Sequence, residues 1–344
     1  MIVGQGIAGS LLAWELKKQG QSFLIIDEGI NESASNRAAG LYNPITGRKM
    51  VKTWRANKLF DGLKKYYQEV ESHLKSQVIY PKYIYRPFFS NEEQNDWQGK
   101  WADTTYSNFI DSIHFKSLQI KGIKDPHGGL LISNSGFVDM PTLISLFKEY
   151  YAHSGDLKTE ALENNQLAFE EGTVKYKEVE AKKIIFCDGA KAVDNSFWSY
   201  LPFRPVKGEI LQIRTNLECD MIVNRSVFMV PKNGTFLVGS TYDHETLDYI
   251  PSERGKQSIR ARLEKIFDLD YDIEKMWAGV RPATFDRRPF IGLHPKNEAV
   301  GIFNGFGTKG VTLVPFFASQ YVNFLLGKET LDSEVNVNRV SEVK

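Results

Sequence analysis

The chain has 344 residues and an almost neutral charge, with 43 basic and 42 acidic side chains. This length allows one large or two modest domains with a substantial core, and the charge balance gives no indication of wholesale binding to nucleic acid or to an anionic membrane. Cys187 and Cys219 are the only cysteines, so we expect neither a disulfide framework nor a metal site, and a cytoplasmic location. No apolar run approaches the ~20 residues of a membrane-spanning helix, so no membrane partner is expected.

Glycines near the N-terminus have the spacing G-x-G-x-x-G, at Gly4, Gly6 and Gly9. A short apolar strand precedes them, an apolar helix follows, and a second apolar strand, 23–26, ends on Asp27. In dinucleotide-binding βαβ units the three glycines permit the turn, the approach of a pyrophosphate and close helix packing. The helix N-terminus attracts the phosphates, and the acid accepts ribose hydroxyls. We therefore predict a dinucleotide site, with a merely structural glycine turn as the alternative, and expect the natural chain to begin slightly upstream.

The next hundred residues are less specific. Residues 28–43 are small and polar and predict a loop that suits a flat ring or a diphosphate, although an ordinary connection explains them equally well. A long helix is predicted over 50–74. Its basic start, Arg48 to Lys58, is either a site for an anionic substrate or phosphates or, as we favour, a solvated face. Aromatic alternation over 78–89 predicts sheet core, with Arg86 and tyrosines lining a pocket as the alternative.

The remaining elements predict an α/β protein with an inserted antiparallel domain. Asn233-Gly234 between two apolar runs is a strong hairpin signal, and the strands around it cannot belong to a parallel sheet. The expected elements are a capped helix after Ser90, a strand at 128–132, a helix at 142–153, short strands over 157–177, a buried parallel strand at 183–187, antiparallel strands at 205–213, 227–231 and 235–241, and a helix at 254–267.

Two glycine-bearing segments follow near the C-terminus. In the first, Gly279-Val280-Arg281-Pro282 places an arginine between a glycine and a proline on a short, stiff segment. In the second, the glycines of residues 304–310 lead into an apolar helix that ends at Gly327. The N-terminus of this helix is a second positive dipole end, which suits a ring carbonyl or an anion.

The order of these motifs resembles the D-amino acid oxidase family of FAD-dependent oxidoreductases, which includes glycine oxidase and sarcosine oxidase. The resemblance implies an α/β fold in which a Rossmann-like FAD-binding domain (1–78, 136–195 and 277–344) accompanies a mostly antiparallel, α+β substrate-binding domain (79–135 and 196–276). The motifs that carry it are the G-x-G-x-x-G with Asp27, residues 35–40, 136–139, 186–189, 204–208, 237–241, 279–286 and the turn at 304–313.

The resemblance also implies an activity and a set of site residues. The expected reaction is oxidation of the C–N bond of an amino acid or secondary amine that carries a carboxylate, by hydride transfer to flavin N5. The FAD is expected to be non-covalent, because the cysteine and histidine that hold the flavin in some members are missing here. The residues expected to bind it are Gly4, Gly6, Ile7, Ala8, Gly9, Asp27, Glu28, Ser35, Arg37, Ala38, Ala39, Gly40, Leu41, Cys187, Gly189, Arg281, Gly305, Phe306, Gly307, Thr308, Lys309 and Gly310.

Two of these residues are expected to be catalytic. Arg281 would hold the substrate carboxylate with its planar guanidinium, although a structural ion pair is the alternative. Lys309, with the following helix dipole, would stabilise the negative charge of the reduced flavin.

Two further hypotheses remain beside the small-molecule amine or amino-acid oxidase. The turn at 305–310 is more similar to that of the FAD domain of the bifunctional tRNA wobble-uridine modification enzyme than to that of sarcosine oxidase, which favours a tRNA-modifying flavoenzyme. The neutral charge weighs against tRNA, as does the lack of a recognisable methyltransferase domain in these 344 residues. A non-catalytic nucleotide-binding module is the third hypothesis. The sequence does not indicate the substrate, the electron acceptor or the oligomeric state.

Overall fold

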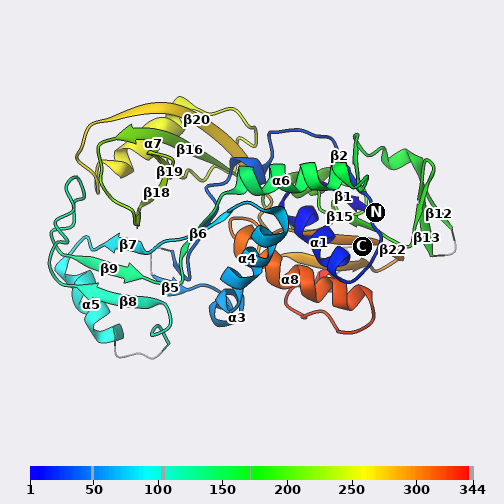
Figure 1. Cartoon of the computed structure of the whole chain (residues 1–344), viewed down its shortest axis with the longest axis horizontal. Coiled ribbons are helices and arrows are strands. Elements are labelled where there is room, and N and C mark those ends of the chain that lie inside the picture. Colours follow the sequence, from blue (N-terminus) through cyan, green and yellow to red (C-terminus); the bar gives the residue numbers. More distant parts are fainter. Residues whose placement is uncertain (48–49, 102–104, 171, 341–344) are drawn as a thin grey trace. The chain divides into compact units, whose positions relative to one another are not determined.

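The computed structural model describes residues 1–47, 50–101, 105–170 and 172–340. The chain forms two compact units, and the chain colouring of Figure 1 shows that each is assembled from separated stretches. Unit 1 comprises Met1–Ala38, Met140–Val206 and Val280–Lys344, and unit 2 comprises Ala39–Asp139 and Lys207–Gly279. The predicted α/β fold class with a mostly antiparallel second unit is confirmed. The unit boundaries differ from the expected domain boundaries chiefly at 39–78, which cluster with unit 2.

A six-stranded sheet in the order β11-β2-β1-β15-β22-β21 forms the centre of unit 1. All neighbouring strands are parallel except the antiparallel pair β21 and β22. The chain runs from β1 outward to β2 and β11 on one side and continues through β15 and β22 on the other, so the sheet has a topological switch point between β1 and β15. The strands are β1 (Ile2–Val3), β2 (Ile25–Asp27), β11 (Leu157–Thr159), β15 (Ile184–Phe186), β21 (Phe290–His294) and β22 (Asn297–Asn304).

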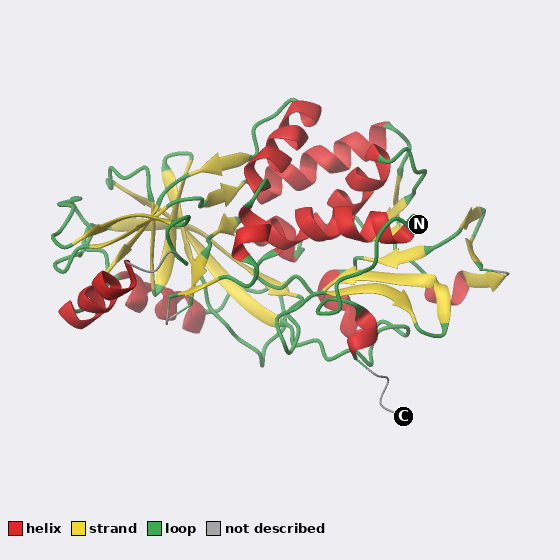
Figure 2. Cartoon of the chain, turned by 90° about the horizontal axis from the view of Figure 1, so that it is seen from below, coloured by secondary structure: helices red, strands yellow, loops and turns green. Residues whose placement is uncertain are grey.

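Helices and a small sheet accompany this central sheet. Helix α1 contacts both α6 and α8, and the long helices of the unit lie on one face of its strands (Figure 2). Strands β12, β13 and β14 form a separate antiparallel sheet, and its Val174 and Tyr176 share a buried cluster with Ile184 and Phe186 of β15. The elements are α1 (Ile7–Lys18), α2 (Ala34–Arg37), α6 (Met140–His153), β12 (Leu167–Glu170), β13 (Thr173–Tyr176), β14 (Val179–Ala181) and α8 (Gly310–Leu325).

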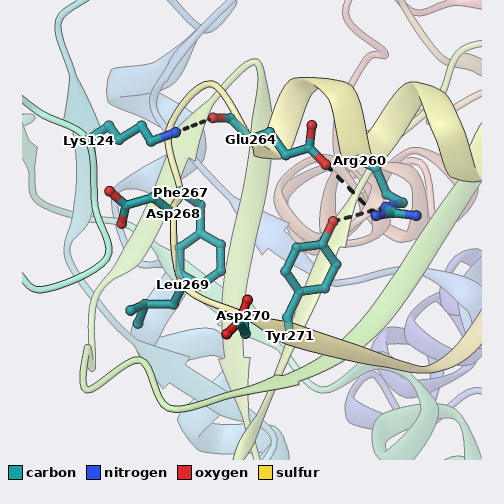
Figure 3. A pocket seen from close by; sticks show the side chains of 8 residues that line it. All are labelled: Lys124, Arg260, Glu264, Phe267, Asp268, Leu269, Asp270 and Tyr271. Atoms are coloured by element: carbon teal, nitrogen blue, oxygen red, sulfur yellow. Dashed lines mark hydrogen bonds and ion pairs between the residues drawn. The ribbon is translucent and has the colours of Figure 1, made fainter.

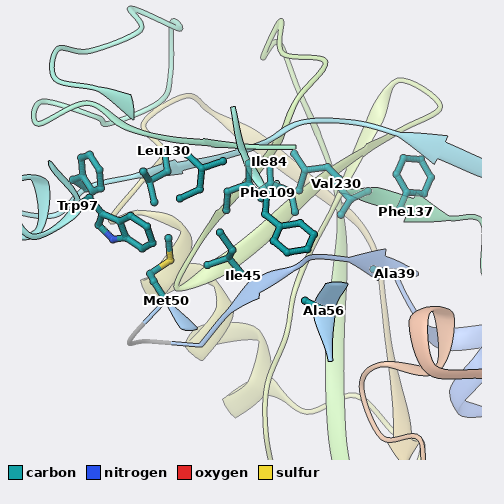
Figure 4. Close-up of a cluster of buried hydrophobic side chains, with 14 of the residues drawn as sticks. Ala39, Ile45, Met50, Ala56, Ile84, Trp97, Phe109, Leu130, Phe137 and Val230 are labelled. Atoms are coloured by element: carbon teal, nitrogen blue, oxygen red, sulfur yellow. The ribbon is translucent and has the colours of Figure 1, made fainter. Parts of the chain in front are cut away.

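An eight-stranded sheet in the order β20-β16-β19-β18-β17-β7-β9-β8 forms the centre of unit 2. Successive side chains of a strand point to opposite faces of the sheet, and this sheet has a hydrophobic core on each face. Ile84 of β7 belongs to one buried cluster, and the next residue, Tyr85, belongs to the other. Figure 4 shows the first cluster. The strands are β7 (Ile84–Pro87), β8 (Ile110–His114), β9 (Gly129–Ile132), β16 (Val206–Thr215), β17 (Ile222–Arg225), β18 (Val227–Lys232), β19 (Thr235–Gly239) and β20 (Tyr271–Arg281).

Smaller sheets and helices accompany the eight-stranded sheet in unit 2. Helix α7 buries Ile259 and Leu263 in the second cluster, and its N-cap Ser252 accepts a hydrogen bond from Gly255 N at 3.0 Å. The elements are β3 (Leu41–Tyr42), β6 (Ile79–Pro81) and β10 (Gly136–Val138), β4 (Ile45–Thr46) and β5 (Val51–Lys52), α3 (Ala56–Phe60), α4 (Leu63–Leu74), α5 (Asn91–Trp101) and α7 (Glu253–Leu263).

The predicted helix over 50–74 is wrong. Strand β5 and helices α3 and α4 occupy this segment, and left-handed backbone at Arg55 (φ 54°) and Gly62 (φ 75°) interrupts it. Glycine adopts this conformation without steric cost, and α4 begins directly after it. Arg48 and Lys49, the first residues of the predicted basic stretch, lie outside the described residues.

Most other predicted elements are confirmed. The hairpin turn has φ of 50° at Asn233 and 74° at Gly234, which is the pattern of a type I′ turn. Ser90 begins α5 by accepting a hydrogen bond from Glu93 N at 3.2 Å. The antiparallel pair β21 and β22 was not predicted, nor was the short helix α2 inside the expected loop at 28–43.

Candidate cofactor site

Most of the predicted cofactor segments meet at one edge of the unit 1 sheet. The glycine turn follows β1, Asp27 ends β2, Cys187 to Gly189 follow β15, and the second glycine turn follows β22. These four strands are neighbours and parallel, so their carboxyl ends lie on the same side. This edge includes the switch point of the sheet, where α/β proteins bind their ligands.

The first glycine turn has the backbone that a dinucleotide turn requires. Gly4 has φ of 98°, and a Cβ there would lie 2.6 Å from the Cys187 carbonyl oxygen. A Cβ on Gly9 would overlap the Gly4 carbonyl oxygen, so only glycine lets α1 pack this closely on the turn. Gly6 is the N-cap of α1, and a Cβ there would approach Ser35 Oγ to 3.1 Å.

The N-terminus of α1 retains its positive dipole end. Gly6 supplies no side-chain cap, and the first turn contains no acidic residue. Ser35 of α2 lies against this end, where its Oγ accepts a hydrogen bond from Ile7 N at 3.0 Å. The arrangement favours an anion at the turn.

Asp27 is held by two backbone donors. Its Oδ2 accepts from Gln5 N at 2.7 Å and its Oδ1 accepts from Gly29 N at 2.8 Å. Each carboxylate oxygen has two lone pairs, so both can accept a further hydroxyl. The neighbouring Glu28 accepts a hydrogen bond from Lys191 Nζ at 2.5 Å.

The second glycine turn lies against the segment that carries Arg281. Gly307 N donates to the Pro282 carbonyl at 3.2 Å, and a Cβ on Gly305, whose φ is 84°, would lie 2.7 Å from Thr284 Cγ2. Arg281 is half-buried at the end of β20. The structure therefore brings the predicted substrate arginine and the predicted flavin turn into one part of unit 1.

Lys309 is the N-cap residue of α8, and the first turn of that helix contains no acidic residue. Burial and, to a smaller extent, the charges of Arg287 and Arg288 lower the pKa of its ammonium group from 10.5 to about 8. The N-termini of α8 and α1 are neighbours, since a Cβ on Gly310 would lie 3.2 Å from Ile7 Cγ2. The positive dipole ends of α1 and α8 and the positively charged side chain of Lys309 are therefore close together.

The donor set fits FAD. The α1 N-terminus and Gly6 would hold the diphosphate, Asp27 the ribose, and the α8 N-terminus with Lys309 the electron-rich edge of the flavin ring. Gly189, with φ of 59°, has open space where a Cβ would be.

Several predicted site residues have other surroundings. Arg37 Nη2 lies 3.4 Å from Glu32 Oε1, and Phe306 is buried with its ring 4.7 Å from that of Phe303. Burial raises the pKa of the Cys187 thiol. The backbone N–H of Cys187 donates to the Val3 carbonyl of β1. Ala39, Gly40 and Leu41 belong to unit 2, so their role in the site stays a prediction, as do those of Ala8, Ala38 and Thr308.

Two residues at this edge received no role from the sequence. Asp188 comes shortly after β15, and Asn304 is the last residue of the neighbouring parallel strand β22. Asn304 Nδ2 donates a hydrogen bond to Asp188 Oδ1 at 2.9 Å. The sequence did contain a signal for this pair, because Asp188 and Asn304 each stand at the end of an apolar run that is typical of a strand. Spacing alone did not show that the two strands are adjacent.

A separate pocket of about 350 Å³ lies in unit 2, at the end of α7 and the start of β20 (Figure 3). Lys124 Nζ donates to the Glu264 carbonyl at 2.8 Å, and Arg260 Nε donates to Tyr271 Oη at 3.2 Å. The lining carries three acidic and two basic side chains, so its charge does not favour an anion. The lining residues are Lys124, Arg260, Glu264, Phe267, Asp268, Leu269, Asp270 and Tyr271, none of them a predicted site residue.

The described residues contain neither a metal-ligating cluster nor a membrane-spanning helix. In those parts of the chain no group of three or more His, Cys, Asp or Glu side chains is arranged to hold a metal ion. Within the same residues, none of the helices has the length and apolarity needed to cross a bilayer.

Two curated proteins are similar in sequence to almost the whole of this chain. The bifunctional protein ThiO/ThiG of Synechocystis sp. is 24% identical over 96% of this chain and 52% of its own length. The tRNA 5-methylaminomethyl-2-thiouridine biosynthesis bifunctional protein MnmC of Legionella pneumophila is 24% identical over 96% of this chain and 54% of its own. The chain thus spans about half the length of these curated relatives.

Solved structures show the same fold. The glycine oxidase of Geobacillus kaustophilus superposes with a TM-score of 0.79 at 20% identity, covering 99% of this chain and 98% of that one. The family described as FAD dependent oxidoreductase, DAO, matches residues 1–322. The chain therefore belongs to the DAO family of FAD-dependent oxidoreductases.

Proposed function

We propose that this chain oxidises the C–N bond of an amino acid or secondary amine that carries a carboxylate. When bound, FAD would supply the redox chemistry, because a flavin can take a hydride from the substrate carbon at N5. The observation that carries the proposal is the contact of the Arg281 segment with the glycine turn before α8, through Gly307 N and the Pro282 carbonyl. The glycine oxidase fold and the family membership support it.

Arg281 is proposed to bind the substrate carboxylate. A guanidinium pairs with a carboxylate through two parallel hydrogen bonds, which set the position of the α-carbon. The backbone around it is restrained, because Ala283 N donates to the Arg281 carbonyl at 2.8 Å and Arg204 N donates to the Ala283 carbonyl at 2.7 Å. Holding the reacting carbon in one place can remove several kcal/mol from a barrier, of the ~7–11 kcal/mol available to positioning.

Lys309 is proposed to stabilise the negative charge that the ring gains on reduction. Its ammonium group is half-buried at a helix N-terminus, with Arg287 and Arg288 nearby. Preorganised positive charge of this kind lowers the energy of a developing anion without reorganisation.

The test compares Arg281→Ala and Arg281→Lys with the wild-type protein in anaerobic bleaching of the flavin by amino acids. Arg214→Ala is the matched control, because Arg214 is an exposed arginine paired with Glu274. We expect Arg281→Ala to raise the half-saturating concentration about 100-fold, since a charge-assisted bidentate pair is worth about 3 kcal/mol, with Arg281→Lys in between. Equal behaviour of Arg281→Ala and Arg214→Ala would reject the assigned role.

A second candidate function is oxidative modification of a tRNA base. The match to the Legionella tRNA-modifying protein over 96% of this chain favours it, and unit 2 presents Lys52, Arg55 and Lys58 around the start of α3. It requires salt-sensitive binding of tRNA and flavin reduction by tRNA alone. A non-catalytic nucleotide-binding module would instead hold FAD without turnover and be indifferent to Arg281→Ala.

A further inference from the structure

Asp188 is a half-buried acid shortly after β15, and its carboxylate is held by two asparagine amides. Its Oδ1 accepts a hydrogen bond from Asn304 Nδ2 and its Oδ2 accepts one from Asn195 Nδ2, both at 2.9 Å. Asn304 and Asn195 are 2% and 6% exposed. Lys191, whose charge acts to lower the pKa of Asp188, donates its hydrogen bond to Glu28. The carboxylate is therefore satisfied by two amides.

Asn304 joins the ends of two strands. Besides its bond to Asp188, its Nδ2 donates to the Gly189 carbonyl at 3.0 Å, and its Oδ1 accepts from Gly305 N at 2.7 Å. One side chain thus connects the turn after β15 with the second glycine turn after β22. Its donors and its acceptor are all directed at backbone or side chain of these two turns.

The first glycine turn packs against the same residue. A Cβ on Gly4 would lie 3.4 Å from Asp188 Cα and 2.6 Å from the Cys187 carbonyl oxygen. The turns after β1, β15 and β22 therefore all meet at Asp188. The turns after β1 and β22 carry the diphosphate and ring sites in the fit of FAD described above, and the turn after β15 lies between them.

The charged carboxylate of Asp188 reduces the stability of the folded protein at neutral pH. Burial raises the pKa of Asp188 from 3.8 to about 6, although both asparagines act to lower it. Folding therefore favours the protonated form, so the contribution of this group to stability falls as pH rises from about 4 through 6 and stays low at neutral pH. A neutral amide of the same shape would avoid that cost, and this gain offsets the penalty of placing its NH2 against one asparagine NH2 donor.

We propose that Asp188 and Asn304 are positioning residues that hold the three cofactor-facing turns in one register and thereby set the affinity for FAD. The inference goes beyond the proposed substrate chemistry and depends only on FAD binding. Neither residue is assigned to the reaction itself. Each acts through the backbone of the turns.

The test measures the dissociation constant of FAD from stripped apoprotein for Asp188→Asn, Asn304→Asp and the exchange of both residues. Asp188→Asn removes one of two acceptor oxygens, and we expect about a 10-fold weaker affinity. Asn304→Asp puts two carboxylates together and should weaken it at least 100-fold. In the double variant the new amide donates to the new carboxylate, so affinity should recover above that of Asn304→Asp. Asp194→Asn, an exposed acid of the segment Gly189–Asp194, is the matched control.

Apoprotein melting separates positioning from a merely structural role. At pH 7 the Asp188→Asn apoprotein should melt at the same temperature as the wild type or higher, while its FAD affinity falls. The wild-type affinity should also fall below about pH 6, where Asp188 protonates, and this dependence should vanish in Asp188→Asn. Unchanged affinity in the single variants, no recovery in the double variant, or melting that falls in parallel with affinity would overturn the proposal. A wild-type protein that binds no FAD would contradict both this proposal and the proposed function. The three outcomes above would contradict this proposal alone.

Discussion

Lys309 shows how surroundings tune a single side chain. Its ammonium group loses hydration by burial and lies near two arginines, so its pKa falls to about 8. Because this pKa lies below 10.5, the folded protein holds the proton less tightly than the unfolded chain between pH 8 and 10.5, and stability from this group rises with pH there. At neutral pH the charge is retained at a cost, which suits a residue that interacts with an anion.

We therefore expect Lys309→Met to lower the reduction potential of bound flavin by about 30 mV. One charge at such a site contributes about 1–2 kcal/mol. For a two-electron couple, ~1.4 kcal/mol corresponds to about 30 mV. The potential of the wild type should lose this advantage above pH 8, where Lys309 deprotonates. Lys309→Arg should keep it to higher pH. Redox titration across pH 6–10 is the measurement, and equal potentials for wild type and Lys309→Met would exclude the assigned role.

The first βαβ unit depends on close contact between elements. Gly9 lies where α1 crosses the turn after β1, and a side chain there would collide with the Gly4 carbonyl. The backbone, not a flexible side chain, forms the obstacle, so neither element can give way cheaply. The dinucleotide turn and the packing of α1 are thus one structural feature.

Gly9→Ala should accordingly destabilise the protein by about 2–3 kcal/mol, as overpacking commonly does, and weaken FAD binding. Gly99→Ala in α5 is the matched control, since nothing lies within 4 Å of a Cβ at that position. It should stabilise by up to about 1 kcal/mol because alanine favours helix. Denaturant unfolding followed by circular dichroism compares them. A Gly9→Ala variant as stable as Gly99→Ala would show that α1 does not pack as described.

Elements with short-range signals were predictable, whereas those that depend on distant contacts were not. The turns at Gly4 and at Asn233-Gly234 follow from local backbone requirements, and both are present. The helix predicted over 50–74 failed because apolar spacing persists through Gly62 while the backbone turns left-handed there. The Asp188 and Asn304 pair could not be predicted, because their contact depends on β15 lying beside β22, 116 residues apart in the chain.

At the scale of the whole molecule, three separate stretches assemble unit 1 and two assemble unit 2. The proposed cofactor residues of unit 1 come from all three of its stretches, because parallel strands need crossover connections that carry the chain away and back. Motif order identified the fold class. It did not place residues 39–78, which cluster with unit 2 through contacts that only the folded chain provides.

The most direct test of the central claim is anaerobic reduction of the flavin by matched pairs of amines that differ only in a carboxylate, such as N-methylglycine and dimethylamine, or alanine and ethylamine. We expect the visible flavin absorption to bleach with at least one carboxylate-bearing member and not with its partner, because Arg281 holds the carboxylate that positions the reacting carbon. Purified protein without flavin, or equal bleaching by both members of each pair, would contradict the account.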